Sequence, residues 1–493
     1  MVSRRVFLTG TGLGGAAALT GCWPSPENNP HDQTKEAAIF DLSFDITSRY
    51  RPFHLLAPGF IQAEKASVGA VSDLVRSDTS PQAPFVAVEL DVVDDAGAVL
   101  LAGLATASGD HVAATYDASG QRVGIEVRRN GRTRLLRRKK VALPDRFGFT
   151  FVLCENQVTV LADTGDGWKP LLTERDRVAG EIDLRDPDVL SQFNYVWGAR
   201  TDSKPAELGA ARAGLFGMAG LRDPHLVQHS DGRPYIRDGK AYLTFTCAGL
   251  GFFRQAHWGV FTLDLSDPTE LEQVGQLYSR RDGLVLGDHA GQVVRDDDSD
   301  QWIVATSSWG DFGRDGVHVR HTTTPDDILH GVHLLDTEPT PLPTSASSWD
   351  PALTRISGRW HVAYVESPSQ TPFDFHPALA RAPQGADWTD GLELVGAATD
   401  LHECEGPILS RVGDRWWLLA SDGDNRLYPV FNLDMHRVGR LDAPYLTNIP
   451  HPQIVPLPSG GHLLVTFDGT PYAKRKLKYG THGDVVIMRS VDS

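Results

Sequence analysis

Five polar residues recur in the C-terminal half of the chain, each at the start of an apolar stretch. They are Asp223, Asp288, Asp350, Glu405 and His451, and they follow one another at intervals of 46 to 65 residues. Carboxylates brought together raise one another's pKa, and burial raises it further. Such a set can supply both an ionised general base and a protonated general acid. The alternative is that each Asp caps a turn before its strand, but turns alone explain poorly why five polar first positions recur.

The segments that follow these residues share one form, which indicates the fold that would position them. Each has an apolar strand, a polar turn with Gly or Asp, and a second strand rich in Trp, Tyr and Val. A repeat of this length fits a blade of four antiparallel strands, and five repeats fill residues 212–493. The innermost strand of each blade begins near the axis, so the five first residues would converge on one central cavity. The sequence therefore predicts a five-bladed β-propeller.

The preceding part, residues 37–201, alternates short strands with Asp-Gly, Ser-Gly and Asn-Gly turns. Period-two alternation of this kind predicts a β-sandwich, and the strand lengths resemble those of the concanavalin or laminin-G type. A basic run, Arg128 to Lys140, is interpreted as a solvated strand pair and turn, with an anionic-ligand patch as the alternative. Glycan binding and a purely structural role both remain open for this domain. The whole chain is expected to be all-β.

Residues 1–22 resemble an export signal. Ser3-Arg4-Arg5-Val6-Phe7-Leu8 resembles a twin-arginine signal, and Leu19-Thr20-Gly21-Cys22 resembles a lipoprotein cleavage box. The resemblance implies that Cys22 carries a lipid and that the chain is exported and anchored to the outer face of the cytoplasmic membrane or the cell envelope. Residues 23–36, rich in Pro, Asn and acidic residues, are expected to form a linker.

The overall composition excludes several classes of function. The formal net charge of -16 argues against a nucleic acid partner held through its phosphates. With 41% hydrophobic residues and 11 Trp among 493 residues, the chain can bury sizeable cores. Only four Cys are present, and Cys154, Cys247 and Cys404 form no close pair or metal-ligand spacing, so they are expected to be buried as small apolar side chains.

Three of the recurring motifs carry a family resemblance. Asp223-Pro224, Trp349-Asp350-Pro351 and Glu405-Gly406-Pro407 are ordered over three repeats, and the similarity covers about residues 217–492. They resemble the Asp, Asp, Glu triad of five-bladed propeller glycoside hydrolases, above all family 43, whose members act on arabinofuranosides, arabinans and xylans. The resemblance implies that Asp223 is the general base, Asp350 raises the pKa of the acid, and Glu405 is the general acid.

The same resemblance implies further site residues. His451 matches a fifth-blade His near a central metal, so it is expected to be a ligand of a Ca²⁺-like ion at the axis; no organic cofactor is expected. Asp288 and His289 stand at the second-blade position, where contacts to substrate hydroxyls fall. Stacking and hydroxyl contacts also favour Trp349 and Arg426, with Trp258 and Trp309 as further candidates.

Together these features predict an inverting glycoside hydrolase that cleaves arabinofuranosyl or other pentose linkages in a polysaccharide. The alternatives are a non-catalytic glycan-binding propeller lipoprotein and a propeller glycosyltransfer enzyme, either a transglycosylase or a phosphorylase. The expected partners are the polysaccharide and, through the lipid alone, the membrane; no nucleic acid partner is expected, and the chain is expected to be a monomer.

Overall fold

The computed structural model describes residues 37–200, 204–312, 316–473, 477 and 479–491. Strands dominate these residues, and the helices among them are short: α1 (Ala37–Phe40), α2 (Arg177–Glu181) and α3 (Pro187–Leu190), with 3₁₀ turns η1 (Phe253–Gln255), η2 (Trp309–Asp311) and η3 (Tyr479–Thr481). The all-β prediction is confirmed. The expected signal (1–22), its Cys22 and the linker (23–36) lie outside the described residues. In the described part, no helix is both long and apolar enough to cross a bilayer.

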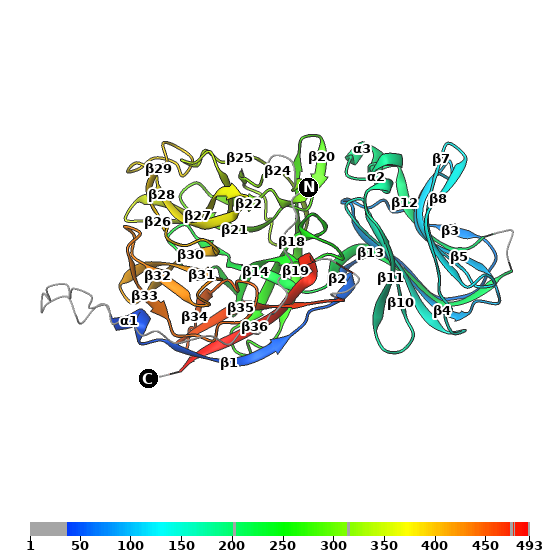
Figure 1. Cartoon of the computed structure of the whole chain (residues 1–493), viewed down its shortest axis with the longest axis horizontal. Coiled ribbons are helices and arrows are strands. Elements are labelled where there is room, and N and C mark those ends of the chain that lie inside the picture. Colours follow the sequence, from blue (N-terminus) through cyan, green and yellow to red (C-terminus); the bar gives the residue numbers. More distant parts are fainter. Residues whose placement is uncertain (1–36, 201–203, 313–315, 474–476, 478, 492–493) are drawn as a thin grey trace, which may run out of the picture.

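The part on the right of Figure 1 is a sandwich of two antiparallel six-stranded sheets, as the described residues define them. A large buried apolar cluster fills the space between the two sheets. One sheet contains, in spatial order, β11 (Trp168–Glu174), β10 (Gln157–Asp163), β9 (Phe147–Cys154), β4 (Phe85–Asp94), β13 (Ala206–Met218) and β2 (His54–Val71). The other contains β3 (Leu74–Arg76), β12 (Phe193–Ala199), β5 (Val99–Thr106), β6 (His111–Asp117), β7 (Arg122–Arg129) and β8 (Arg132–Lys140).

The basic run covers the last two residues of strand β7 and all of strand β8, which are joined by a turn at Asn130 and Gly131, both with positive φ. Strand β8 lies at the edge of its sheet, and eight of its nine residues are exposed. Charged side chains on an edge strand hinder pairing with other chains. The interpretation of this run as a solvated strand pair and turn is therefore confirmed.

Five further sheets, counted over the described residues, form the part on the left of Figure 1. The first contains β14 (Leu221–Leu226), β17 (Lys240–Cys247), β18 (His257–Asp264), β19 (Leu271–Arg281) and β20 (Leu284–Leu286), with β16 (Ile236–Arg237) and β24 (Gly331–Asp336) alongside. The second contains β15 (Gln228–His229), β21 (His289–Asp296), β22 (Gln301–Ser307), β23 (Val319–Thr324) and β25 (Glu338–Pro339). The third contains β26 (Ser347–Ile356), β27 (Arg359–Gln370), β28 (Phe373–Arg381) and β29 (Glu393–Ala397). The fourth contains β30 (Cys404–Val412), β31 (Arg415–Asp422), β32 (Tyr428–Phe431) and β33 (Arg437–Leu441). The fifth contains β34 (Gln453–Pro456), β35 (His462–Pro471), β36 (His482–Val491) and β1 (Ser43–Tyr50).

These sheets close into a ring, because each neighbouring pair encloses a buried apolar cluster. Separate clusters join the first sheet to the second, the second to the third, the third to the fourth, and the fourth to the fifth. A further cluster joins the fifth sheet back to the first. Radial packing of antiparallel sheets is the arrangement of a β-propeller, and we call this part the ring.

The strand pairing divides the chain differently from the expected ranges 37–201 and 212–493. Strand β1 pairs with β36, so the first described strand belongs to the ring and closes its fifth sheet. Strand β13 pairs with β2 and β4, so residues up to Met218 belong to the sandwich. The sequence could not show this, because the partners of β1 and β13 are far away along the chain.

The sandwich and the ring share a buried apolar interface. Phe85 and Val152 of the sandwich pack in one cluster with Leu250 and Tyr278 of the ring. The cysteines Cys154, Cys247 and Cys404 are buried and free, and burial raises the pKa of each thiol, as expected for side chains that serve as small apolar groups.

Candidate functional site

The innermost strands of four ring sheets carry the same irregularity. In β14, β21, β26 and β30 the register with the next strand shifts, so that two consecutive residues of the innermost strand lie opposite a single residue of its neighbour. The first residue of each pair has a positive φ: Asp223 (51°), Ala290 (57°), Asp350 (51°) and Gly406 (65°). Such β-bulges re-aim side chains and are common beside active sites. The bulges therefore align the four repeats, because the first bulge residue of one repeat is structurally equivalent to the first bulge residue of the others.

His451 lies between the carboxylates of two of these bulge residues. Its Nδ1 is 3.8 Å from Oδ1 of Asp223, and its Nε2 is 3.7 Å from Oδ2 of Asp350. A Cβ at Gly406 would lie 2.4 Å from Cγ and Cδ2 of His451. Only a glycine at this position allows the imidazole of His451 to lie so close to the backbone. The structure therefore brings together Asp223, Asp350 and His451, residues from three repeats, as the sequence predicted.

The two aspartates have opposite pKa shifts. Burial, together with the charges of Glu405 and Asp223, holds the pKa of Asp350 well above its ordinary value, although the N–H of Gly406 donates to its Oδ2 at 3.1 Å. Burial also acts to raise the pKa of Asp223, but His451 and Arg222 outweigh it, and the pKa is lowered. Environments that separate the pKa values of neighbouring acids are typical of acid–base sites.

Glu405 precedes the bulge residue Gly406 and is less buried than Asp350. The indole Nε1 of Trp349 donates to Oε2 of Glu405 at 3.2 Å. Trp349 occupies the same position in β26 that Glu405 has in β30, one residue before the bulge. Trp349 is 2% exposed, so little of its face is left for the expected sugar stacking, and the contact that the structure shows is with the carboxylate that the sequence predicted to be the acid.

Arg222 is a site residue that the sequence reasoning did not select. It precedes the bulge residue of β14, and its side chain is 2% exposed. Its Nε lies 3.9 Å from Oδ2 of Asp223, its guanidinium stands over the ring of Phe253, and Nη1 lies 3.5 Å from Nδ1 of His482. The signal in the sequence was its position, one residue before the repeated Asp-Pro.

In the second sheet, the expected substrate contact of Asp288 is wrong. Asp288 precedes β21 and does not occupy the bulge position, which is taken by Ala290. Its carboxylate is fully buried, receives two hydrogen bonds from Arg281 at 2.7 and 2.9 Å, and accepts the N–H of Gly310 at 3.0 Å. Asp288 is thus committed to an internal ion pair instead of a substrate contact.

His289 is the residue of β21 that precedes the bulge, as Arg222 does in β14. Its Nδ1 donates to the carbonyl of Gly287 at 2.8 Å, which leaves Nε2 as an acceptor. Burial lowers the pKa of His289 to about 4, and Arg222 adds to the effect, so the ring is neutral at neutral pH. The side chain is 1% exposed, and its expected contact with a sugar hydroxyl stays a prediction.

Aromatic side chains gather beside the site. Trp309 stacks on His289 with ring centroids 6.3 Å apart and contacts Trp349 at 5.7 Å, while Phe373 lies parallel to Trp349 at 6.0 Å. They belong to one apolar cluster that spans the second and third sheets. Trp258, the remaining candidate, is buried between the first and second sheets and serves as core.

Arg426 follows strand β31 at the end of the ring where β30 begins, because Cys404 pairs with Asp422. Its side chain donates to the carbonyl of Leu446 at 3.2 Å and stands 5.7 Å from the centroid of Tyr445. The residue is exposed. It therefore lies on the same face as the site, and its substrate contact stays a prediction.

The expected Ca²⁺-like ion finds no matching donor set. Within the described ranges, no group of three or more His, Cys, Asp and Glu side chains is arranged to hold a metal ion. Both ring nitrogens of His451 face carboxylates of the site, Asp223 and Asp350. Both nitrogens are buried and make no hydrogen bond among the described residues, and the expected ion stays a prediction.

No family model matches the chain, and no curated protein matches it. Several solved structures do. A GH62 α-L-arabinofuranosidase catalytic domain of Coprinopsis cinerea has 11% sequence identity and a TM-score of 0.37, over 56% of this chain and 92% of that one. A GH43 β-xylosidase/α-arabinofuranosidase from a compost microbial metagenome has 12% identity and a TM-score of 0.39, over 55% and 91%. A GH43 enzyme of Xanthomonas citri, solved with xylose, has 15% identity and a TM-score of 0.37, over 55% and 87%.

Proposed function

We propose that this chain is a glycoside hydrolase that cleaves arabinofuranosyl or other pentose linkages in a polysaccharide by an inverting acid–base mechanism. The observation that carries the proposal is the convergence of Asp223, Asp350 and Glu405 from three repeats, with the pKa of Asp223 lowered and that of Asp350 raised. Inverting glycosidases require one carboxylate as base and one carboxylic acid as proton donor.

The environments support a role for each acid. Asp223 is ionised at neutral pH and takes a proton from the attacking water, whose oxygen bonds to the anomeric carbon. As the bond to the leaving oxygen breaks, Glu405 gives its proton to that oxygen. Asp350 is 2% exposed, so its role is to orient Glu405 and tune its pKa instead of touching the sugar.

The test is hydrolysis by the purified chain of arabinan, arabinogalactan, xylan, fructan and mannan, followed by reducing-end release. We expect an arabinose-containing polymer to be cleaved and the anomeric product to be inverted when followed by NMR. Glu405→Gln removes the proton donor at constant shape, so we expect turnover to fall at least about 10²-fold with binding retained.

The matched control is Glu393→Gln, which changes an exposed carboxylate on the outer strand β29 of the ring. This variant should hydrolyse at the original rate. Full activity in Glu405→Gln would remove Glu405 from the mechanism. Silence on every polymer, with glycan binding retained, would instead indicate the non-catalytic glycan-binding propeller.

A further inference from the structure

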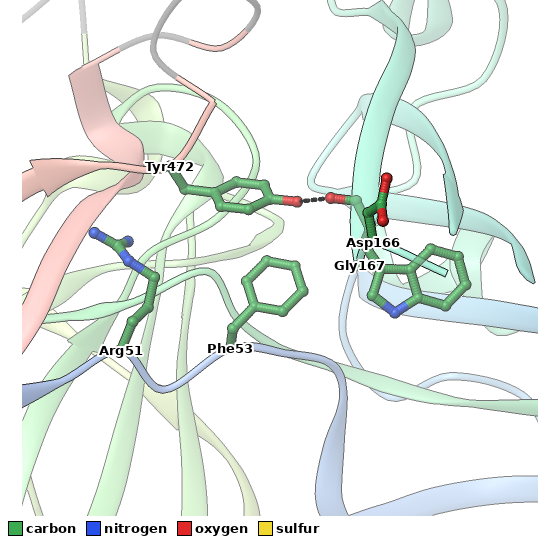
Figure 2. A pocket seen from close by; sticks show the side chains of 6 residues that line it. Arg51, Phe53, Asp166, Gly167 and Tyr472 are labelled. Atoms are coloured by element: carbon green, nitrogen blue, oxygen red, sulfur yellow. Dashed lines mark hydrogen bonds between the residues drawn. The ribbon is translucent and has the colours of Figure 1, made fainter. Parts of the chain in front are cut away.

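A cavity of about 310 Å³ lies at the junction of the sandwich and the ring (Figure 2). Its walls come from both parts: Trp168 begins β11 of the sandwich, and Tyr472 follows β35 of the ring. The hydroxyl of Tyr472 donates to the carbonyl of Trp168, which ties the two parts together at this point. The lining residues are Arg51, Phe53, Asp166, Gly167, Trp168 and Tyr472.

The local strand pairing positions the indole of Trp168. Gly148, Asp163 and Trp168 are neighbours across β9, β10 and β11. A Cβ at Gly148 would lie 2.8 Å from Cη2 of Trp168, so the indole rests over the glycine backbone. The side chain is half-buried, and so are Phe53 and Tyr472, whose ring centroids are 4.7 Å apart. Three aromatic rings therefore meet at one partly open cavity.

The cavity offers hydrogen-bond acceptors beside the guanidinium of Arg51. The carboxylate of Asp166 is 79% exposed and pairs with Lys169, a surface residue, at 3.1 Å. The hydroxyl oxygen of Tyr472 can still accept, because its proton goes to the carbonyl of Trp168. Arg51 is the cation of the lining set, and its guanidinium is bound to the carbonyl of Ala219 at 2.7 Å and to Asp484 at 2.6 Å.

This combination matches a neutral sugar ring. Aromatic faces pack on the C–H faces of a sugar, and a carboxylate accepts from its hydroxyls. An anion would meet the exposed carboxylate of Asp166 and a guanidinium that protein groups already occupy, so its binding is disfavoured.

The cavity lies on the same face of the ring as the candidate site. Strand β35 runs antiparallel to β34, so Tyr472 leaves the ring at the end where β34 begins, beside His451. The N–H of Tyr472 donates to the carbonyl of Thr481 at 3.3 Å, and the hydroxyl of Thr481 donates to the carbonyl of Tyr472 at 3.0 Å. The next residue, His482, contacts Arg222 of the candidate site.

We propose that the junction cavity is a second glycan-binding site, which holds one sugar ring of the polysaccharide chain through Trp168, Phe53 and Asp166. The choice of polysaccharide rests on the proposed function; the sugar class of the ligand rests on the cavity itself. Its role is to hold the polymer beside the candidate site, so it acts on polymers and leaves small substrates unaffected.

The experiment measures binding of arabinan to the full chain carrying Glu405→Gln, by affinity electrophoresis and by quenching of tryptophan fluorescence. Loss of one stacking platform should weaken polymer binding about ten-fold in Trp168→Ala, and Trp168→Phe, which keeps an aromatic face, should restore most of it. Asp166→Asn, at an exposed position, should weaken binding without changing the unfolding temperature. In chains with Glu405 intact, hydrolysis of 4-nitrophenyl α-L-arabinofuranoside should be unchanged by these substitutions, while arabinan hydrolysis falls.

Two results separate the cavity proposal from the proposed function. Binding that depends on Trp168 and Asp166, together with no hydrolysis by the chain that retains Glu405, would support the cavity and refute the glycosidase. Binding that is insensitive to both substitutions would overturn the cavity proposal. So would a loss of binding in Trp168→Ala that is accompanied by a lower unfolding temperature and is not restored by Trp168→Phe, because the aromatic residues would then only pack the junction.

Discussion

Asp350→Asn should stabilise the ring at neutral pH while it lowers hydrolysis, because this substitution removes a buried carboxyl group whose ionisation is disfavoured in the folded state. The carboxylate is 2% exposed, and burial, Glu405 and Asp223 raise its pKa. The N–H of Gly406 donates to it at 3.1 Å, and the amide oxygen of the substituted side chain can still accept this hydrogen bond.

The size of the effect follows from the geometry. One imidazole ring, that of His451, separates the two aspartates, with contacts of 3.8 and 3.7 Å. Their oxygens therefore lie within about 10 Å, and with an effective dielectric constant of about 20 their repulsion is about 1.7 kcal/mol. A gain of about 1–2 kcal/mol in the free energy of unfolding corresponds to a rise of about 2–6 °C in the unfolding temperature.

The gain should depend on pH with a defined sign. Because the folded-state pKa of Asp350 lies above its ordinary value of 3.8, the folded state binds the proton more tightly, and the original protein loses stability as pH rises through this window. The difference between the variant and the original protein should be near zero below the ordinary pKa of 3.8 and should grow as the pH rises above it. Thermal unfolding followed by near-UV circular dichroism at several pH values measures it.

Asp288→Asn is the matched control, since Asp288 is equally buried but holds Arg281 with both oxygens. Removing its charge leaves a buried guanidinium with fewer partners, so it should destabilise the chain by about 3–5 kcal/mol at neutral pH. If Asp350→Asn behaved like Asp288→Asn, with a loss of stability that does not change with pH, then Asp350 would be a structural residue and the reasoning from crowded carboxylates would be refuted.

Two further substitutions probe the alignment of the acid. Trp349→Phe removes the hydrogen bond to Glu405 and should lower kcat about 10- to 100-fold, with a shift of the alkaline limb of the pH–rate profile, which the general acid sets; an unchanged profile would contradict the orienting role. Gly406→Ala adds a Cβ 2.4 Å from His451 at a φ of 65° and should cost more stability and activity than Gly239→Ala, where φ is 76° but nothing lies within 4 Å. Equal costs in activity and unfolding temperature would show that backbone strain alone is responsible.

The repeats themselves were sufficient to predict much of the fold and part of the site. Alternating apolar residues predicted strands, and the recurrent Asp-Pro starts predicted that Asp223 and Asp350 meet, as they do on either side of His451. The second repeat was misaligned by two residues, because Asp288 resembles Asp223 in type while Ala290 occupies the equivalent bulge. Arg222 was not selected, since a basic residue beside Asp-Pro gives no sign of burial.

The sequence by itself determined which segments are strands, how many repeats follow one another and which acidic residues are available, because these depend on local periodicity and residue type. Tertiary structure decided which side chain of each repeat enters the site, since a shift of one residue in a strand turns every side chain to the opposite face and a bulge resets that register. It also decided that β1 completes the fifth sheet beside β36 and that Trp168 contacts Tyr472 across the junction. These contacts join residues hundreds of positions apart, so they depend on packing and not on the local sequence pattern.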